Sequence, residues 1–216
     1  MNAVFAPLPF TLHATTGCPP HAELALSLAW TFDATLDAAV LDEELDRRAL
    51  LLPEPASPHP LDELRTLVAP TPRAPGARDM DVDCLLLHTA LHSKAPHPLA
   101  LAVIGAELAR RRGLSIGIVS NGSEHCLAHT ELPAPLLLRV ETGQIVDAHR
   151  LPPALTWRCA HEVAGLMIDE LEPRWLAQGR IDNALHAAEL RLCLPFDDRG
   201  REIAERKLKR VSALLN

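Results

Sequence analysis

The 216-residue sequence contains no tyrosine, and aromatic residues make up only 3% of it. It also lacks any uninterrupted apolar run near the roughly 20 residues that a membrane-spanning helix needs. The first ten residues contain neither a basic segment nor a long apolar one, which is not the pattern of a secretory signal. These absences argue against a membrane-embedded or secreted protein and favour one that works in the cytoplasm.

An excess of positive charge is lacking as well. Lysine and arginine number 21 against 28 aspartates and glutamates, giving a formal net charge of -7. Acidic and basic residues are interspersed, so no broad basic surface is available to hold phosphate backbones. Neither nucleic acid nor a membrane is an expected partner. Hydrophobic residues at 48% and charged residues at 23% are typical of a globular protein with a substantial core.

The five cysteines are an odd number, are widely scattered and form no CxxC pair. This argues against both a disulfide framework and a structural zinc cluster. A reducing compartment fits this cysteine usage, and no cofactor is expected.

Helix-forming patterns dominate the N-terminal third, where apolar residues recur at helical spacing. Proline removes a backbone donor and restricts the residue before it, so proline-dense stretches must be connectors. The expected helices cover 21–52 (two helices, broken near 33–36), 61–68 and 80–92, with connectors at 53–60 and 70–78.

The clearest single element covers 98–112. An apolar stripe that includes Leu101, Ile104 and Leu108 follows helical spacing, and Gly113 supplies a stop. Short strands are expected afterwards at 115–119, 126–130, 136–141 and 144–148, with turns at Asn121-Gly122 and Thr142-Gly143. A core helix followed by a small antiparallel sheet is therefore predicted.

From Trp157 onward the pattern is helical again, with helices expected at 160–171, 174–178, 181–192 and 199–215. Around Gly179 we expect a helix, a tight turn and a second helix packed antiparallel on the first. A single hairpin of this kind does not bury its own apolar face, so it must dock on something. Trp157 and Trp175 are expected to anchor this tail. The predicted class is α+β, divided into a helical lead (1–69), a core (70–153) and a helical tail (154–216).

The segment 98–149 resembles a known family. Pro98-Leu-Ala-Leu-Ala, the run from Glu107 to Gly113-Leu, His125-Cys-Leu and Ile145-Val-Asp147 resemble the core of transglutaminase-like proteins of the bacterial SirB type. The segment from Gln178 to Pro195 resembles the tetratricopeptide-like tail of many members. The resemblance implies a papain- or transglutaminase-like core helix packed on an antiparallel sheet. It also implies that His125 and Asp147 occupy the histidine and aspartate positions of a cysteine-hydrolase site, on neighbouring strands.

The nucleophile is missing from that pattern. A working enzyme of this kind places a cysteine at the N-terminus of the core helix, where the helix dipole and an imidazolium lower its pKa. Here the equivalent positions are Pro98 and Ala100, preceded by His97, and none of them is a thiol. His125 and Asp147 are therefore expected to be degenerate remnants that form a structural hydrogen-bonded pair.

Two cysteines are alternative nucleophiles. Cys84 lies on the preceding apolar segment and would have to approach His125, but its leucine neighbours favour a buried packing role. Cys126 adjoins His125, yet successive strand residues point to opposite faces. Both are better explained by core packing.

Histidines suggest a further alternative, since 11 of them are present. His88 and His92 are four residues apart on an expected helix, and with His97 they could offer imidazoles to one metal ion. No glutamate follows His88, so the HExxH pattern is incomplete.

The sequence thus favours a non-catalytic, degenerate transglutaminase-like protein that binds a protein or peptide partner. An enzymatic role is not favoured, because the expected cysteine is absent. The alternatives are an active cysteine hydrolase or acyltransferase with an unplaced thiol and, third, a histidine-based metal-binding protein.

Overall fold

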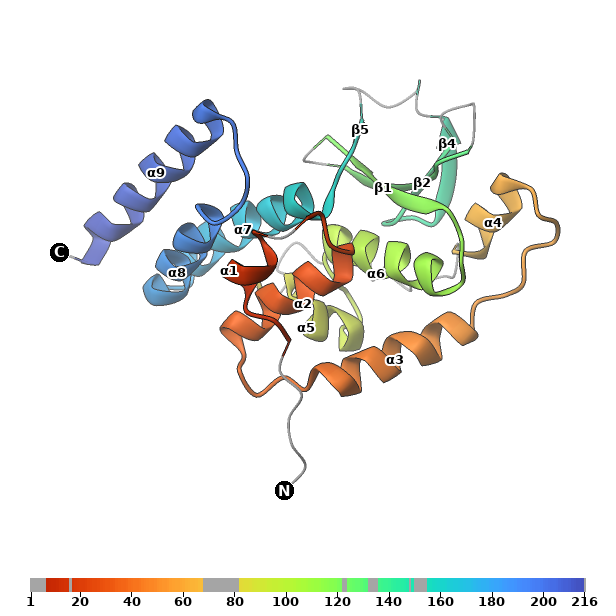
Figure 1. The fold of residues 1–216 in the computed structure, drawn as a ribbon, viewed down its shortest axis with the longest axis horizontal. Coiled ribbons are helices and arrows are strands. Elements are labelled where there is room, and N and C mark those ends of the chain that lie inside the picture. Colours follow the sequence, from red (N-terminus) through yellow and green to blue (C-terminus); the bar gives the residue numbers. More distant parts are fainter. Residues whose placement is uncertain are drawn as a thin grey trace.

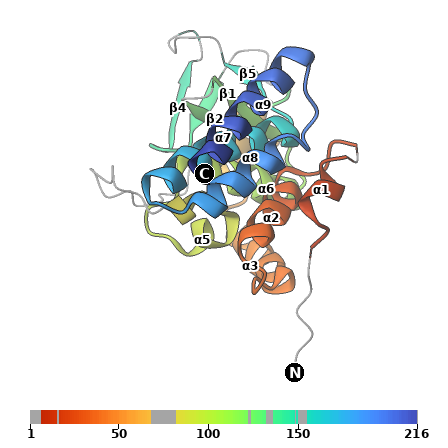
Figure 2. The same ribbon diagram turned by 90° about the vertical axis from the view of Figure 1, so that its left-hand side faces the viewer.

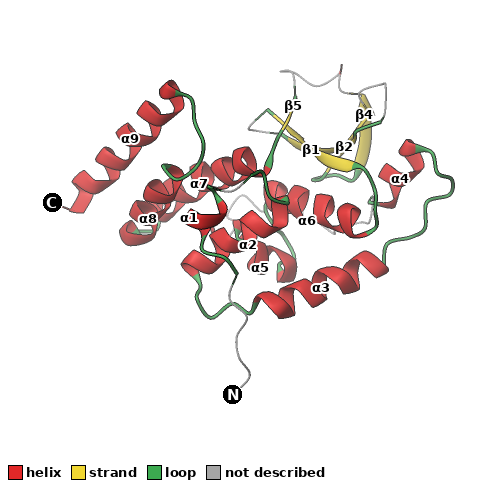
Figure 3. Cartoon of the chain, viewed as in Figure 1, coloured by secondary structure: helices red, strands yellow, loops and turns green. Residues whose placement is uncertain are grey.

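The computed structural model describes residues 7–15, 17–67, 82–121, 124–131, 136–147, 149 and 155–215. Within these residues the protein has the predicted α+β class: one antiparallel sheet lies at the edge of a group of helices that come from both ends of the chain (Figure 3). No described helix is long and apolar enough to cross a bilayer.

The N-terminal helices follow the prediction closely. The break between the second and third helices arises because the Asp33 carboxylate accepts hydrogen bonds from the backbone N–H and hydroxyl of Thr35. Asp37 then caps the third helix by accepting from the N–H of Ala39 at 2.9 Å. The helices are α1 (Phe10–His13), α2 (His21–Phe32), α3 (Ala38–Leu50) and α4 (Pro60–Thr66).

The prediction of a single helix over 80–92 is wrong in the part that the structure describes, residues 82–92. A 3-10 helix, η1 (Val82–Leu85), is followed by α5 (Leu87–His92), and Leu86 between them is extended. The remainder of that prediction, with the connector at 70–78, lies outside the described residues.

The core helix α6 (Pro98–Arg111) is confirmed almost to the residue. Pro98 stands at the first turn, where a missing N–H costs nothing. At the other end Gly113 has φ +71°, a conformation that ends the helix and favours glycine.

The sheet has the strand order β4-β3-β2-β1-β5, antiparallel throughout. Gly143, with φ +66°, forms the tight turn between β3 and β4, as expected; Gly122 of the other predicted turn lies outside the described residues. The strands are β1 (Ile116–Ser120), β2 (His125–His129), β3 (Leu136–Arg139), β4 (Gln144–Asp147) and β5 (Thr156–Trp157).

One face of the sheet packs on α6, and α2 and α3 lie on the other side of that helix (Figures 1 and 2). Leu127 of β2 fits directly over Gly105 of α6, where an added Cβ would come within 2.6 Å of the leucine Cδ1. The opposite face of the sheet carries a separate small apolar cluster formed by Val119, Cys126, Ala128 and Leu137. Alternate residues of β2 therefore enter different apolar clusters.

An ionic cluster ties α3 to the C-terminal end of α6. Arg111 donates to the buried carboxylate of Glu107 at 2.8 Å and contacts Asp42 and Asp46 of α3. Arg110 binds the same Glu107 but is exposed to solvent.

The tail folds back on the N-terminal helices. The expected helical hairpin is present, with Gly179 at φ +72° in its turn. Its first helix packs on α2 and buries Trp175 completely, so the hairpin docks within the chain. Trp157, the other expected anchor, is 51% exposed. The helices are α7 (Ala160–Ala177), α8 (Ile181–Arg191), α9 (Asp198–Ser212) and the 3-10 turn η3 (Ala213–Leu215).

The break expected near residue 172 is wrong, because α7 continues through Pro173. Proline removes one helical hydrogen bond there. The side chains of Leu171 and Trp175 on either side are fully buried in the core, and this burial offsets the loss. One hydrophobic core includes residues of all three sequence segments, among them Leu28, Val103 and Met167.

Candidate functional site

The N-terminus of α6 faces the start of β2. His97 is the N-cap of α6: its Nδ1 accepts a hydrogen bond from the N–H of Leu99 at 3.2 Å. The His97 ring lies beside the His125 ring, with 6.3 Å between centroids. The arrangement expected at the site, with His125 close to the N-terminus of the core helix, is therefore present. We call His97, Pro98, Ser120 and His125 the α6–β2 junction.

His125 is bonded to a serine. Its Nδ1 lies 2.9 Å from Ser120 Oγ on the neighbouring strand β1, and both residues are buried. Burial lowers the pKa of His125 to about 4; Glu141 opposes this shift and Arg158 adds to it. The imidazole is therefore neutral near pH 7.

The expected pair of His125 and Asp147 is not formed. β3 lies between β2 and β4, and the register places Asp147 in the row of Leu136 and His129, at the other end of β2 from His125. Two strand spacings sideways and four residues along the strand separate their Cα atoms by about 16 Å. The Asp147 carboxylate instead accepts a hydrogen bond from the N–H of His149 at 2.9 Å.

The residue opposite His125 on the next strand is apolar. Extending the β2–β3 register by one residue beyond Arg139, the last residue of β3, places Val140 opposite His125. At the expected nucleophile positions, Pro98 and Ala100 are both buried and offer no reactive group. Among the described residues no thiol or carboxylate forms a hydrogen bond with His125, and Glu141 acts on the imidazole through its charge.

Both alternative cysteines are engaged elsewhere. Cys84 is close through its backbone, since its carbonyl accepts the N–H of His97 at 3.2 Å, but its sulfur lies 3.3 Å from Ser93 Oγ. Cys126 points to the face of the sheet away from α6, as alternation along the strand predicts. Burial raises the pKa of Cys126 to about 12, so it is protonated at neutral pH.

The three candidate metal-binding histidines do not gather. His88 lies 3.5 Å from Asp33, whereas His92 is exposed at the end of α5 and His97 caps α6. Burial lowers the pKa of His88, and no hydrogen-bond partner of its buried Nδ1 is found among the described residues. Within the described part of the chain, the metal-binding side chains that do gather are Cys18, Cys159 and His161.

The sequence also gave no indication of Ser120 or Arg174 at the junction. Ser120 is found only once the β1–β2 register is known, because Ser120 and His125 are Cα partners in that ladder. Arg174 of α7 brings its Nη2 to 3.4 Å from Nε2 of His97.

An apolar groove starts beside the junction and follows α6. It has a volume of about 280 Å³. Pro96, which precedes His97 in the chain, is one of its lining residues, and so is Leu51, just after α3, with 70% of its surface accessible. The apolar side chains lining this α6 groove include Leu51, Leu52, Leu101, Ile104, Leu108, Leu127, Leu138 and Val140.

Comparison of this chain with protein-family models, with curated proteins and with solved structures finds no match in any of the three. The resemblance to transglutaminase-like proteins therefore stays a prediction from the sequence.

Proposed function

We propose that this chain is a non-catalytic, transglutaminase-like module that binds an apolar segment of a partner protein in the α6 groove. The observation that carries the proposal is the hydrogen bond between His125 and Ser120, at a junction where no thiol among the described residues is bonded to the imidazole.

Thiol acyl transfer needs a sulfur within hydrogen-bond reach of the imidazole and a third group that orients the ring. The ring of His125 has Ser120 as its hydrogen-bond partner, and no carboxylate among the described residues is hydrogen-bonded to it. Ser120 does not replace the thiol as a nucleophile, because none of its surface is accessible to a substrate. Its bond to Nδ1 is the kind that fixes a ring in place.

The α6 groove supports binding as the remaining role. Its volume of about 280 Å³ is near the lower end of ligand sites, which suits one or two apolar side chains better than a large cofactor. Leu51, which lines the groove, and its neighbour Leu50 are 70% and 77% exposed, so apolar surface continues from the groove wall to the solvent. Contiguous apolar surface of this kind is a feature of sites that bind a partner. Apolar walls with exposed leucines at the rim fit a peptide with an apolar anchor.

The proposal is tested by selecting random peptides on the immobilised chain and measuring the affinity of the enriched peptides by fluorescence anisotropy. Wild type should enrich peptides with a shared apolar anchor. Leu51→Glu should weaken them about tenfold or more, because it places a charge at an apolar rim.

Val40→Glu is the matched control. Val40 is also apolar and exposed, at 59%, and lies on α3 but is not among the residues that line the α6 groove. Its replacement should leave the affinity unchanged. A selection without any consensus, or an equal loss in both variants, would refute peptide binding in the groove.

A further inference from the structure

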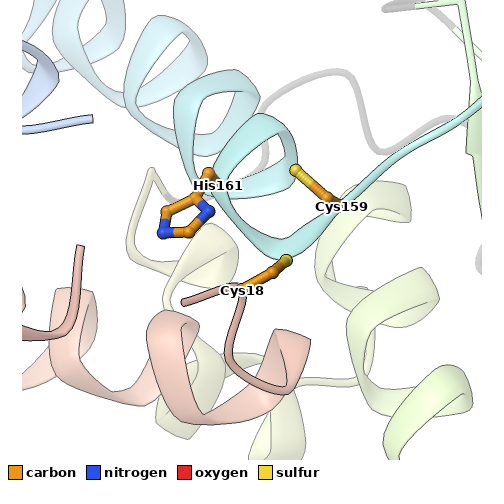
Figure 4. A group of neighbouring side chains, drawn as sticks. All are labelled: Cys18, Cys159 and His161. Atoms are coloured by element: carbon orange, nitrogen blue, oxygen red, sulfur yellow. The ribbon is translucent and has the colours of Figure 1, made fainter. Parts of the chain in front are cut away.

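A second cluster of reactive side chains lies far from the α6–β2 junction in sequence and combines two cysteines with a histidine. The ligand atoms of Cys18, Cys159 and His161 all lie within 4.8 Å of one another. Cys18 comes from the segment before α2, and the other two come from the start of α7 (Figure 4). We call these three residues the thiol–imidazole cluster.

The fold itself brings the two segments together. Nε2 of His21, the first residue of α2, lies 2.9 Å from the carbonyl oxygen of Arg158, immediately before Cys159. α2 and α7 also pack against each other behind this contact. On the α7 side, the N–H of Cys159 donates to the Glu162 carboxylate at 2.9 Å, which fixes the backbone at the helix N-terminus. These contacts fix the backbone around both cysteines, and the Cys159 sulfur also accepts the N–H of Glu162 in the capping box of α7.

His161 is the third donor of the cluster, and its side chain is buried, at 9% exposure. Figure 4 shows the ring nitrogen bonded to Cγ, which is Nδ1, on the side of the two sulfurs, and Nε2 on the far side of the ring. Nδ1 is therefore the nitrogen that an ion held between the sulfurs would meet. A buried imidazole that faces two thiols at this distance is a donor set that suits a metal ion.

We propose that Cys18, Cys159 and His161 bind a thiophilic divalent ion of the Zn²⁺ class, with a fourth position left for water. Two thiolates and one imidazole are donors that zinc prefers, at about 2.3 Å for sulfur and 2.0–2.1 Å for nitrogen. Tetrahedral coordination at those lengths brings the donor atoms to about 3.5–3.8 Å from one another. Both cysteines are exposed, so small rotations of their side chains and the entry of an ion are unhindered.

Two other uses of these residues explain less. A disulfide between the two sulfurs would leave the imidazole without a role. A thiol nucleophile at a helix N-terminus needs a lowered pKa, whereas partial burial of its sulfur raises the pKa of Cys159, against opposing backbone N–H groups of Glu162 and His161. A bound cation accounts for all three side chains, because it displaces the thiol protons and offsets the thiolate charge.

The test is a titration of the reduced, chelator-treated chain, purified without a histidine tag, with Co²⁺ and then with Zn²⁺. One Co²⁺ per chain should bind with the intense visible absorption of tetrahedral cobalt bonded to thiolate, and Zn²⁺ should displace it. Cys18→Ser, Cys159→Ser and His161→Asn should each lower the affinity about tenfold or more. Cys193→Ser is the matched control, since Cys193 is a partly exposed free thiol outside the cluster.

Cys18→Ser keeps the test valid if changes on α7 disturb folding, because Cys18 is exposed and precedes α2. Absence of binding by wild type, or an equal loss in Cys193→Ser, would overturn the proposal. A chain isolated without reductant that is two hydrogens lighter by mass and binds no ion would overturn it as well, because the two sulfurs then form a disulfide. None of these outcomes depends on whether peptides bind in the α6 groove.

Discussion

Replacing His125 by asparagine should make the stability of the protein less sensitive to acid. The pKa of His125 is about 4 in the folded chain, against an ordinary value of 6.5. Between these values the unfolded chain binds a proton that the folded chain does not, so stability falls as the pH falls from 6.5 towards 4. Well above pH 6.5 neither state binds this proton, so His125 then causes no loss of stability by protonation.

The shift corresponds to about 3 kcal/mol in total, of which about 2 kcal/mol is lost between pH 7 and pH 5. Urea unfolding of wild type and His125→Asn at both pH values measures the difference. Asparagine suits the test because its side-chain amide can occupy the place of Nδ1 and keep a hydrogen bond to Ser120 Oγ. His88, whose pKa burial also lowers, is present in both proteins, so its effect cancels.

The matched control for this experiment is His92→Asn, since His92 is exposed at the end of α5. It should lose as much stability as wild type between pH 7 and pH 5. If His125→Asn lost as much as wild type too, the burial of a neutral imidazole at the α6–β2 junction would be refuted.

Two further predictions concern the fold. Arg111→Met should lower the free energy of unfolding by about 2–4 kcal/mol, because it leaves the buried Glu107 carboxylate with one exposed partner; Arg110→Met, at the exposed partner, should cost less than about 1 kcal/mol in the same urea titration. Equal losses would contradict the ionic link between α3 and α6. Gly179→Ala should cost about 1 kcal/mol or more, because φ is +72° there; an unchanged thermal midpoint would show that the turn does not need this conformation.

Local signals predicted most of the helices. Asp33 and Thr35 break the N-terminal helical run through short-range hydrogen bonds, and Gly113 and Gly179 end helices through their backbone freedom. Each signal acts over a few residues, so the sequence contains all the information needed. At Pro173 the local signal failed, because burial of the flanking side chains outweighs one lost hydrogen bond.

The candidate site was harder to predict because it depends on strand order and register. The neighbourhood of His125 and α6 was expected correctly, yet its partner is Ser120 on β1 and not Asp147 on β4. No local sequence pattern indicates that β3 lies between β2 and β4 in the sheet. Cys18 and Cys159 were likewise beyond reach, since they meet only through the packing of α2 on α7.

The central claim, that His125 activates no thiol, is tested most directly by the alkylation rate of each cysteine, followed by mass spectrometry in the native and the urea-unfolded chain. Cys84 and Cys126 are buried, and the pKa of Cys126 is about 12, so both should react far more slowly in the native chain. If either reacted faster in the native chain, and His125→Asn removed that acceleration, the account of a non-catalytic junction would be contradicted.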